Sequence, residues 1–179
     1  MMNFVSHGTQ DMYPTFLQRD WGFTPQRRAA LTAFSMIGAI LGGTLAGLWS
    51  DRMGRRRMIV TSLIGATLVI PAWAFAPSLG VLVAGAFFMQ FFVQGAWGVI
   101  PAHITELSPD SVRGFLPGFA YQCGVLIASS VAWLEAVFAK TSSYHWAMAF
   151  TAGSVFALCA LTAALGPEKK GVPYGAAPP

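Results

Sequence analysis

The sequence predicts an all-α integral membrane protein with six transmembrane helices. Two observations support this fold class. Charged residues make up only 10% of the 179 residues while hydrophobic residues make up 55%, and the apolar residues fall into long stretches. A soluble domain carries about a quarter of its residues as Asp, Glu, Lys and Arg. The shortage of charge therefore excludes an ordinary soluble domain.

Each apolar stretch is close to the roughly 20 residues that an α-helix needs to cross a bilayer. Short polar connectors separate the stretches, so consecutive helices are expected to lie side by side and antiparallel. In chain order the expected helices cover Met1–Gln18, Ala29–Trp49, Met58–Ala76, Leu79–Ala102, Phe115–Phe138 and Trp146–Leu165. Residues 1–166 thus form the predicted membrane domain. Residues 167–179, rich in Pro, Gly and Ala, are predicted to be a disordered tail.

The basic residues predict the orientation of the chain in the membrane. Seven of them fall on one side, at Arg52, Arg55, Arg56, Arg57, Arg113, Lys169 and Lys170, and four on the other, at Arg19, Arg27, Arg28 and Lys140. The positive-inside rule then places the connector around Arg55 and the C-terminus in the cytoplasm. The net charge of +4 is explained by topology, and because no aromatic and basic surface accompanies it, no nucleic acid is expected as a partner.

Small residues have two predicted structural roles. Gly38, Gly42, Gly43 and Gly47 form a stripe on the second helix, and such stripes let helix backbones approach closely in lipid. The cysteines, Cys123 and Cys159, both lie in apolar runs and are expected to be small buried residues rather than a disulfide or a metal site.

Polar residues gather on one face of the first predicted helix. At 100° per residue, Asn3, Ser6, His7, Gln10 and Asp11 fall within an arc of roughly 140°. An ionised Asp costs about 2.5–3.5 kcal/mol at the centre of a membrane helix. We therefore expect this face to line a cavity, while Val5 and Met12 turn away from it.

The polar face suits a proton and a small anion. A histidine titrates near pH 6.5 and can exchange a proton with a neighbouring carboxylate, and Asn and Gln amides can bond the oxygens of a carboxylate. Hydrogen bonding between helices would account for single residues such as Asn3, Ser6 or Thr9. His7 and Asp11 have a spacing that suits a metal, but two ligands are too few. No metal or cofactor is expected, and without a nucleophile-and-base pair or a phosphate loop no enzyme is expected.

Two connectors resemble elements of the major facilitator superfamily. "GLWSDRMGRRR" (Gly47–Arg57) resembles its signature loop, G-x-x-x-D-R-x-G-R-R, and "PAHITELSPDSVRG" (Pro101–Gly114) resembles its E-x-x-P…R-G element. The resemblance implies that the signature loop is a gate for alternating access. Glu106 and Arg113 are expected to pair with it, and His103 reads as a polar residue at a helix end. The loop residues assigned to gating are Asp51, Arg52, Gly54, Arg55 and Arg56.

The first helix is similar to one branch of that superfamily. "NFVSHGTQDMYPT" (Asn3–Thr15) matches every specified position of N-x-x-[ST]-H-x-[ST]-Q-D-x-x-x-T, the signature of the Jen-type lactate and pyruvate:proton symporters, which are related to sialate:proton symporters. "YQCG" (Tyr121–Gly124) resembles the Y-Q-x-G of that family, although Val125 stands where members commonly have Asn. The resemblance implies that substrate and proton are handled by Asn3, His7, Gln10, Asp11 and Gln122.

The family places this signature in its seventh helix. The six helices then correspond to helices 7–12, the C-terminal half of the facilitator fold, in a multi-pass protein of the plasma membrane. Only Met1 and Met2 precede Asn3, so we expect a truncated first helix and a missing N-terminal half.

The predicted function is transport of small monocarboxylates coupled to protons, with this half inactive alone. The expected partners are a small carboxylate, a proton, the lipid bilayer and the missing half. The alternatives are a carrier of another organic acid, such as a dicarboxylate or sialic acid, and a non-transporting membrane fragment with a sensing or regulatory role.

Overall fold

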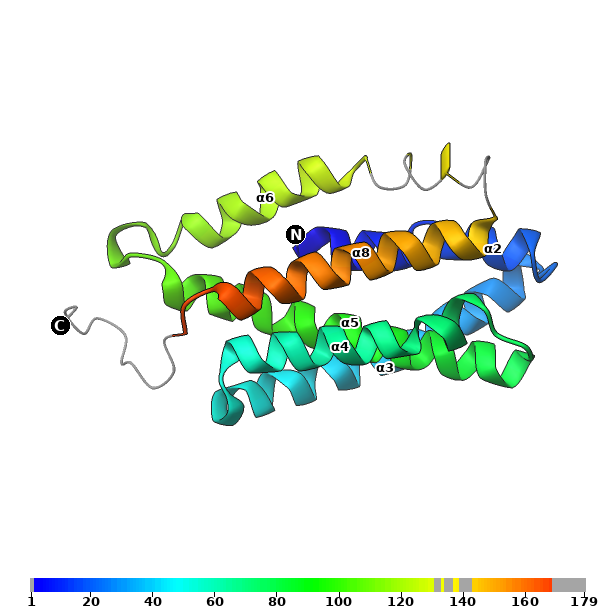
Figure 1. Cartoon of the computed structure of the whole chain (residues 1–179), viewed down its shortest axis with the longest axis horizontal. Coiled ribbons are helices and arrows are strands. Elements are labelled where there is room, and N and C mark those ends of the chain that lie inside the picture. Colours follow the sequence, from blue (N-terminus) through cyan, green and yellow to red (C-terminus); the bar gives the residue numbers. More distant parts are fainter. Residues whose placement is uncertain (1, 131–132, 134–136, 139–142, 169–179) are drawn as a thin grey trace.

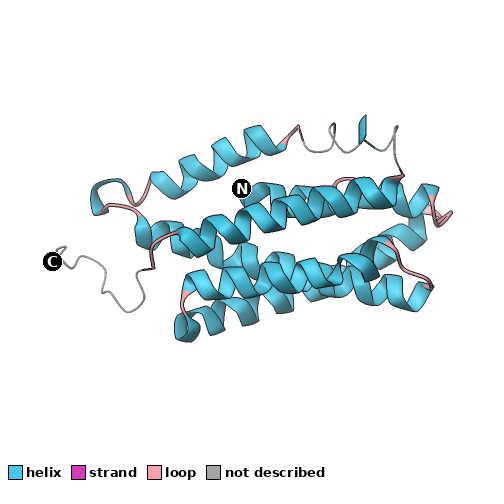
Figure 2. Cartoon of the chain, in the orientation of Figure 1, coloured by secondary structure: helices cyan, strands magenta, loops and turns pink. Residues whose placement is uncertain are grey.

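The described part of the chain is helical throughout, which confirms the all-α class. A computed structural model describes residues 2–130, 133, 137–138 and 143–168, and this part contains no strand (Figure 2). In chain order the elements are α1 (Met2–Gln10), α2 (Tyr13–Arg19), α3 (Pro25–Met53), α4 (Arg55–Ala74), α5 (Leu79–Leu107), the 3-10 turn η1 (Asp110–Val112), α6 (Leu116–Ala128) and α8 (Tyr144–Leu165).

Four of these helices, α3, α4, α5 and α8, are long and apolar enough to cross a membrane. They correspond to the second, third, fourth and sixth predicted helices, and α3 and α5 extend beyond the predicted ends. The fifth predicted helix, Phe115–Phe138, is represented by α6, an apolar helix of 13 residues. Several residues of its second half lie outside the described residues.

The first predicted helix is not continuous, and the expectation of one uninterrupted segment over Met1–Gln18 is wrong. The chain bends at Asp11 and Met12, between α1 and α2. Pro14 explains the break, because a proline has no N–H to donate to the carbonyl four residues earlier, that of Gln10. Pro14 fits the first turn of the new helix α2, where no intrahelical donor is required.

Helices α3 and α4 both pack along α5, and α8 lies against α4 and α1 (Figure 1). Two glycines of the predicted stripe make the closest approach. A Cβ at Gly42 would overlap the backbone carbonyl of Phe91 on α5, and one at Gly38 would overlap that of Phe87. The packing role is therefore confirmed for these two positions, whereas a Cβ at Gly47 would meet open space.

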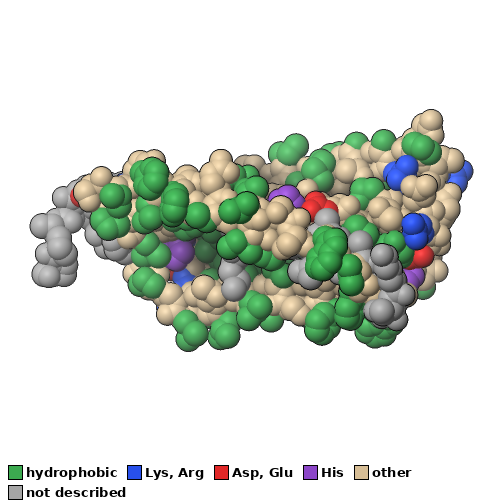
Figure 3. Space-filling model, turned by 90° about the horizontal axis from the view of Figure 1, so that it is seen from above, with side chains coloured by type: hydrophobic (Ala, Val, Ile, Leu, Met, Phe, Trp, Pro, Cys, Tyr) green, Lys and Arg blue, Asp and Glu red, His purple; other side chains and the backbone are tan. Residues whose placement is uncertain are grey.

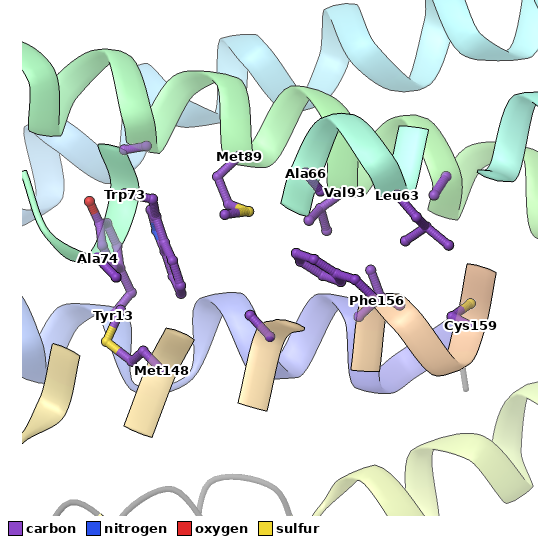
Figure 4. Close-up of a cluster of buried hydrophobic side chains, with 14 of the residues drawn as sticks. Tyr13, Leu63, Ala66, Trp73, Ala74, Met89, Val93, Met148, Phe156 and Cys159 are labelled. Atoms are coloured by element: carbon purple, nitrogen blue, oxygen red, sulfur yellow. The ribbon is translucent and has the colours of Figure 1, made fainter. Parts of the chain in front are cut away.

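The apolar core lies between α4 and α5 on one side and α2 and α8 on the other (Figure 4). Trp73 is 1% exposed and stacks on Tyr13 with ring centroids 5.3 Å apart, and Phe156 of α8 is also buried. Cys159 is buried here as predicted. The same prediction is wrong for Cys123, which is exposed on α6.

Apolar side chains also cover much of the surface. Figure 3 shows one face on which hydrophobic side chains are spread along the whole length, with most of its visible Lys and Arg side chains gathered at one end. Leu68 on α4, Leu126 on α6 and Leu165 on α8 are each more than 75% exposed. Exposed apolar surface of this extent is expected of helices that face lipid.

Candidate functional site

Helix α1 turns two different faces to its surroundings. Val5 and Thr9 are 1% exposed and point into the bundle, where α1 contacts α8, α6 and α5. The Thr9 hydroxyl donates to the backbone carbonyls of Val5 and Ser6 at 3.1 and 3.0 Å, so it is satisfied within the helix. The side chains of His7 and Asp11 stay 39% and 33% exposed and define the accessible face.

His7 and Asp11 form a close pair on this face. The Nδ1 atom of His7 lies 3.0 Å from Oδ2 and 3.2 Å from Oδ1 of Asp11. The i, i+4 spacing brings the two side chains together, and the Asp11 N–H still donates to the His7 carbonyl at 3.1 Å, although the regular helix ends at Gln10. The pair can therefore share a proton while both side chains remain accessible.

Gln10 is joined to a residue that sequence reasoning did not assign to the site. Its Nε2 donates to Oε1 of Gln90 on α5 at 3.1 Å, and Gln90 is 5% exposed. A buried amide needs a partner, so this bond fixes the orientation of both side chains. The signal in the sequence was a glutamine inside a run of apolar residues.

Asn3 lies apart from the accessible pair. It is 3% exposed, and its Nδ2 donates to the Tyr121 carbonyl of α6 at 2.8 Å. A Cβ at Gly124 would lie 2.8 Å from the same Nδ2, which explains why a glycine suits the YQCG segment. Gln122 is exposed on α6. The structure thus pairs His7 with Asp11, ties Gln10 to α5 and connects α1 to α6 through Asn3.

The predicted signature loop is reduced to one residue. Gly54 alone separates α3 from α4, with φ +99° and ψ +146°. An L-residue with a side chain rarely adopts this conformation. The tight turn is confirmed, but Asp51 and Arg52 lie in the last turn of α3, and Arg55 and Arg56 in the first turn of α4.

Arg55, the first residue after this turn, makes polar contacts with both α3 and α5. Its Nη2 lies 2.6 Å from Oδ1 of Asp51, and its Nε lies 3.0 Å from Oε1 of Glu106 at the end of α5. Its Nη1 donates to the Ser50 hydroxyl. The predicted contact between Glu106 and the signature segment is therefore present, and it joins the α3–α4 turn to α5.

The other predicted gating residues make different contacts. Arg56 donates its backbone N–H to Oε2 of Glu168 at 2.9 Å and its Nη1 to the Gly166 carbonyl at 3.0 Å. This contact with the segment after α8 was not predicted. Arg113 pairs with Asp110 and donates to the Ser108 carbonyl, both close to it in sequence.

His103 is 8% exposed, and its Nδ1 is buried without a hydrogen-bond partner in the part of the chain that the structure describes. The expected place near the end of a helix is correct, because α5 ends four residues later at Leu107.

A second histidine contact lies at the other end of α4. The Nδ1 of His145, at the start of α8, lies 2.6 Å from the carbonyl of Ala74, and its Nε2 lies 3.5 Å from Oδ2 of Asp20. This arrangement ties α8 to the end of α4 and to the segment after α2. Sequence reasoning gave no sign of it, because the three residues are far apart in the chain.

Metal chemistry finds no support in the described residues. They contain no group of three or more His, Cys, Asp or Glu side chains placed to hold an ion. The accessible groups at the end of α1 are the imidazole of His7 and the carboxylate of Asp11, and Gln10 forms a hydrogen bond to α5.

Comparison with known proteins gives consistent matches. The family model described as Major Facilitator Superfamily matches residues 2–178. The carboxylic acid transporter protein homolog of Saccharomyces cerevisiae is 29% identical over 93% of this chain and 29% of its own length. The niacin transporter NiaP of Acinetobacter baylyi is 30% identical over 88% of this chain and 36% of its own length. The glucose transporter GlcP of Staphylococcus epidermidis is 28% identical over 73% of this chain and 29% of its own length.

The chain thus spans about a third of the length of these relatives. All three are named as transporters, and none of the three names describes an enzyme. The match to the family model covers nearly the whole chain, and the four long apolar helices agree with an integral membrane protein that crosses the bilayer several times. The chain therefore belongs to the major facilitator superfamily.

Proposed function

We propose that this chain forms the substrate and proton site of a symporter for small monocarboxylates such as lactate and pyruvate. The observation that carries the proposal is the His7–Asp11 pair, with 3.0 Å between Nδ1 and Oδ2 and both side chains about one third exposed. An imidazole and a carboxylate in a membrane segment are costly, and where they occur they commonly mark a substrate or proton pathway.

The geometry of the pair favours a carboxylate as cargo. Nδ1 of His7 faces Asp11, which leaves Nε2 as the ring atom that can donate to a substrate oxygen. When His7 binds a proton it becomes a cation, and the substrate carboxylate then gains an electrostatic partner. Proton and anion are thus expected to bind together.

Gln10 is proposed to select the orientation of the substrate. Because its Nε2 is held by Gln90, its Oε1 is left as an acceptor and its second N–H as a donor. These groups suit the hydroxyl or keto group next to the carboxylate in lactate or pyruvate. Gln122 is proposed to act from α6, and Asn3 of α1 is proposed to act beside it, joined to α6 through its bond to the Tyr121 carbonyl.

A second six-helix unit is proposed to complete the site. Transporters of this fold bind substrate near the membrane midplane between two repeats, and this chain spans about a third of the length of the relatives compared. The opposite unit is proposed to supply a cation for the carboxylate. The chain alone is then expected to bind substrate weakly and not to transport it.

The proposal also includes the orientation of the chain in the membrane and its location in the cell. The basic side chains at Arg52, Arg55, Arg56 and Arg57 are proposed to face the cytoplasm, together with the C-terminus, in the plasma membrane. The proposed gate is the turn at Gly54, closed by the Arg55–Glu106 ion pair.

Binding to the full chain tests the assignment of the site. The chain in lipid nanodiscs is mixed with lactate, and saturation-transfer NMR, which detects millimolar affinities, reports contact with the lactate methyl group. We expect transfer that weakens as the proton concentration falls, because proton and carboxylate are proposed to bind together. His7→Ala and Asp11→Asn should each abolish the transfer.

The matched control is His145→Gln, which removes a histidine at the start of α8, beside the C-terminal end of α4. This variant should leave the saturation transfer at the wild-type level. Lactate binding that survives both His7→Ala and Asp11→Asn would refute the site. Competition with malate, sialic acid, nicotinate and glucose ranks the alternative cargoes. Uptake of radiolabelled lactate by vesicles that contain this chain alone would contradict the need for a second unit.

A further inference from the structure

A groove lies between α3 and α4, with α5 as its floor. Helices α3 and α4 each pack along α5 but touch one another much less, and the space between them has a volume of about 240 Å³. Its walls are almost entirely apolar. They include Trp49 and Met53 of α3, Met58 and Thr61 of α4, and Phe92 of α5.

This groove is separate from the proposed substrate site. Gln90 marks the face of α5 that contacts α1, through its bond to Gln10. At 100° per residue, Phe91 and Phe92, which line the groove, point roughly 100° and 200° away from Gln90 around α5. Trp49 and Met53 on its rim are 51% and 43% exposed. The groove therefore opens on the outer surface of the bundle, away from the face of α5 that contacts α1.

The length of the groove matches one leaflet of a bilayer. On α3 its lining extends from Gly42 to Met53, a distance of about 17 Å at 1.5 Å per residue. The hydrocarbon core of a bilayer is about 30 Å thick, so one leaflet supplies about half of that. The groove thus runs from the Gly54 turn to about the middle of the membrane.

An uncompensated charge lies at the polar end of the groove. Arg57 is exposed and precedes Thr61 by four residues, so both lie on the same face of α4. Arg55 is paired with Asp51 and Glu106. No carboxylate among the described residues pairs with Arg57 within salt-bridge distance, and Arg57 directly precedes Met58, the first residue of α4 in the groove lining.

We propose that the groove binds an acyl chain of an anionic phospholipid, with the lipid phosphate at Arg57. Apolar walls exclude water and suit a hydrocarbon chain, and a guanidinium binds phosphate oxygens by charge-assisted hydrogen bonds. A basic residue at the membrane surface contributes about 1 kcal/mol to binding of anionic lipid. The preference over a zwitterionic lipid should therefore be about fivefold.

Quenching of Trp49 fluorescence by brominated lipids tests the proposal. The full chain is reconstituted in vesicles that contain increasing fractions of brominated phosphatidylglycerol in phosphatidylcholine, or of brominated phosphatidylcholine in phosphatidylglycerol. The signal of Trp49 is the difference between the wild-type chain and Trp49→Phe. We expect brominated phosphatidylglycerol to reach half of its maximal quenching at about one fifth of the mole fraction that brominated phosphatidylcholine needs.

Two variants test separately the contribution of the Arg57 charge and that of the apolar groove to lipid binding. Arg57→Gln should bring the two half-quenching fractions together, while Arg27→Gln, which removes an exposed arginine at the other end of α3, should leave the fivefold difference. Thr61→Phe, which fills the groove, should weaken quenching by both lipids, with helix content checked by circular dichroism.

The proposal would be overturned if both brominated lipids reached half of their maximal quenching at the same mole fraction in the wild-type chain. It would also be overturned if Arg27→Gln removed the fivefold difference as fully as Arg57→Gln does. Trp49 that neither lipid quenches would show that a second copy of the chain or another protein covers the groove, which also overturns it.

Discussion

Arg55 is bound by two carboxylates that differ in exposure, and this difference predicts unequal effects on stability. Glu106 is 17% exposed and Asp51 is 62% exposed, while Arg55 itself is 19% exposed. Glu106→Gln and Asp51→Asn each remove one charge and keep the shape of the side chain. We expect Glu106→Gln to destabilise the chain and Asp51→Asn to have little effect.

The distances and exposures give the magnitudes. At 3.0 Å and an effective dielectric constant of about 20, the attraction between Arg55 and Glu106 is about 5.5 kcal/mol. Desolvation of both groups offsets much of this, and a hydrogen bond to a charged group contributes about 1.5–3 kcal/mol net. Glu106→Gln should therefore cost about 2 kcal/mol of the free energy of unfolding. Asp51→Asn should cost about 0.2–1 kcal/mol, as is usual for exposed pairs.

The assay is reversible unfolding of the full chain in mixed micelles, titrated with sodium dodecyl sulfate and followed by circular dichroism. Double-mutant cycles with Arg55→Gln isolate each pair. Salt provides an independent check, because the screening length falls to about 3 Å in 1 M salt and should weaken the exposed pair more. A cost of Asp51→Asn equal to that of Glu106→Gln, or a coupling between Arg55 and Glu106 below about 0.5 kcal/mol, would refute this reasoning.

Two further changes test contacts made by α5, each measured by the same unfolding assay. Gly42→Ala should destabilise the chain by about 1–3 kcal/mol, because its Cβ would overlap the Phe91 carbonyl. Gly47→Ala is the matched control, with open space at that position, and a loss as large as that of Gly42→Ala would contradict the packing argument. Gln90→Met keeps the volume but removes the acceptor of the Gln10 bond, so it should cost about 1–3 kcal/mol and weaken lactate binding. An unchanged free energy of unfolding would show that Gln10 finds another partner.

Local patterns in the sequence predicted the parts of this structure that depend on neighbours in the chain. The polar arc on α1 follows from the helical period, and the pairing of His7 with Asp11 follows from their spacing. The turn between α3 and α4 follows from Gly54 and the charges around it. Each of these features needs only one helix or one turn to form.

The features that sequence reasoning missed depend on partners far away in the chain. Gln90 becomes a site residue only because α5 lies beside α1, and Glu168 reaches Arg56 only because α8 ends near the start of α4. The break between α1 and α2 was missed for another reason. Apolar residues continue through Tyr13 and Leu17, so composition extended the helix past Pro14, although a proline removes the bond that would hold it together.

Helix α5 connects the proposed site to the Gly54 turn. Gln90, near the middle of the helix, holds Gln10, and Glu106, near its C-terminal end, holds Arg55, with sixteen residues or about 24 Å of helix from one to the other. Pro101 lies between the two contacts and removes one helical hydrogen bond, which is a known cause of helix bending. The contacts of Gly38 and Gly42 fix the segment before Pro101 to α3. A change at the proposed substrate site is therefore expected to move α3 and the first part of α5 together, and a bend at Pro101 is one motion that would separate Glu106 from Arg55.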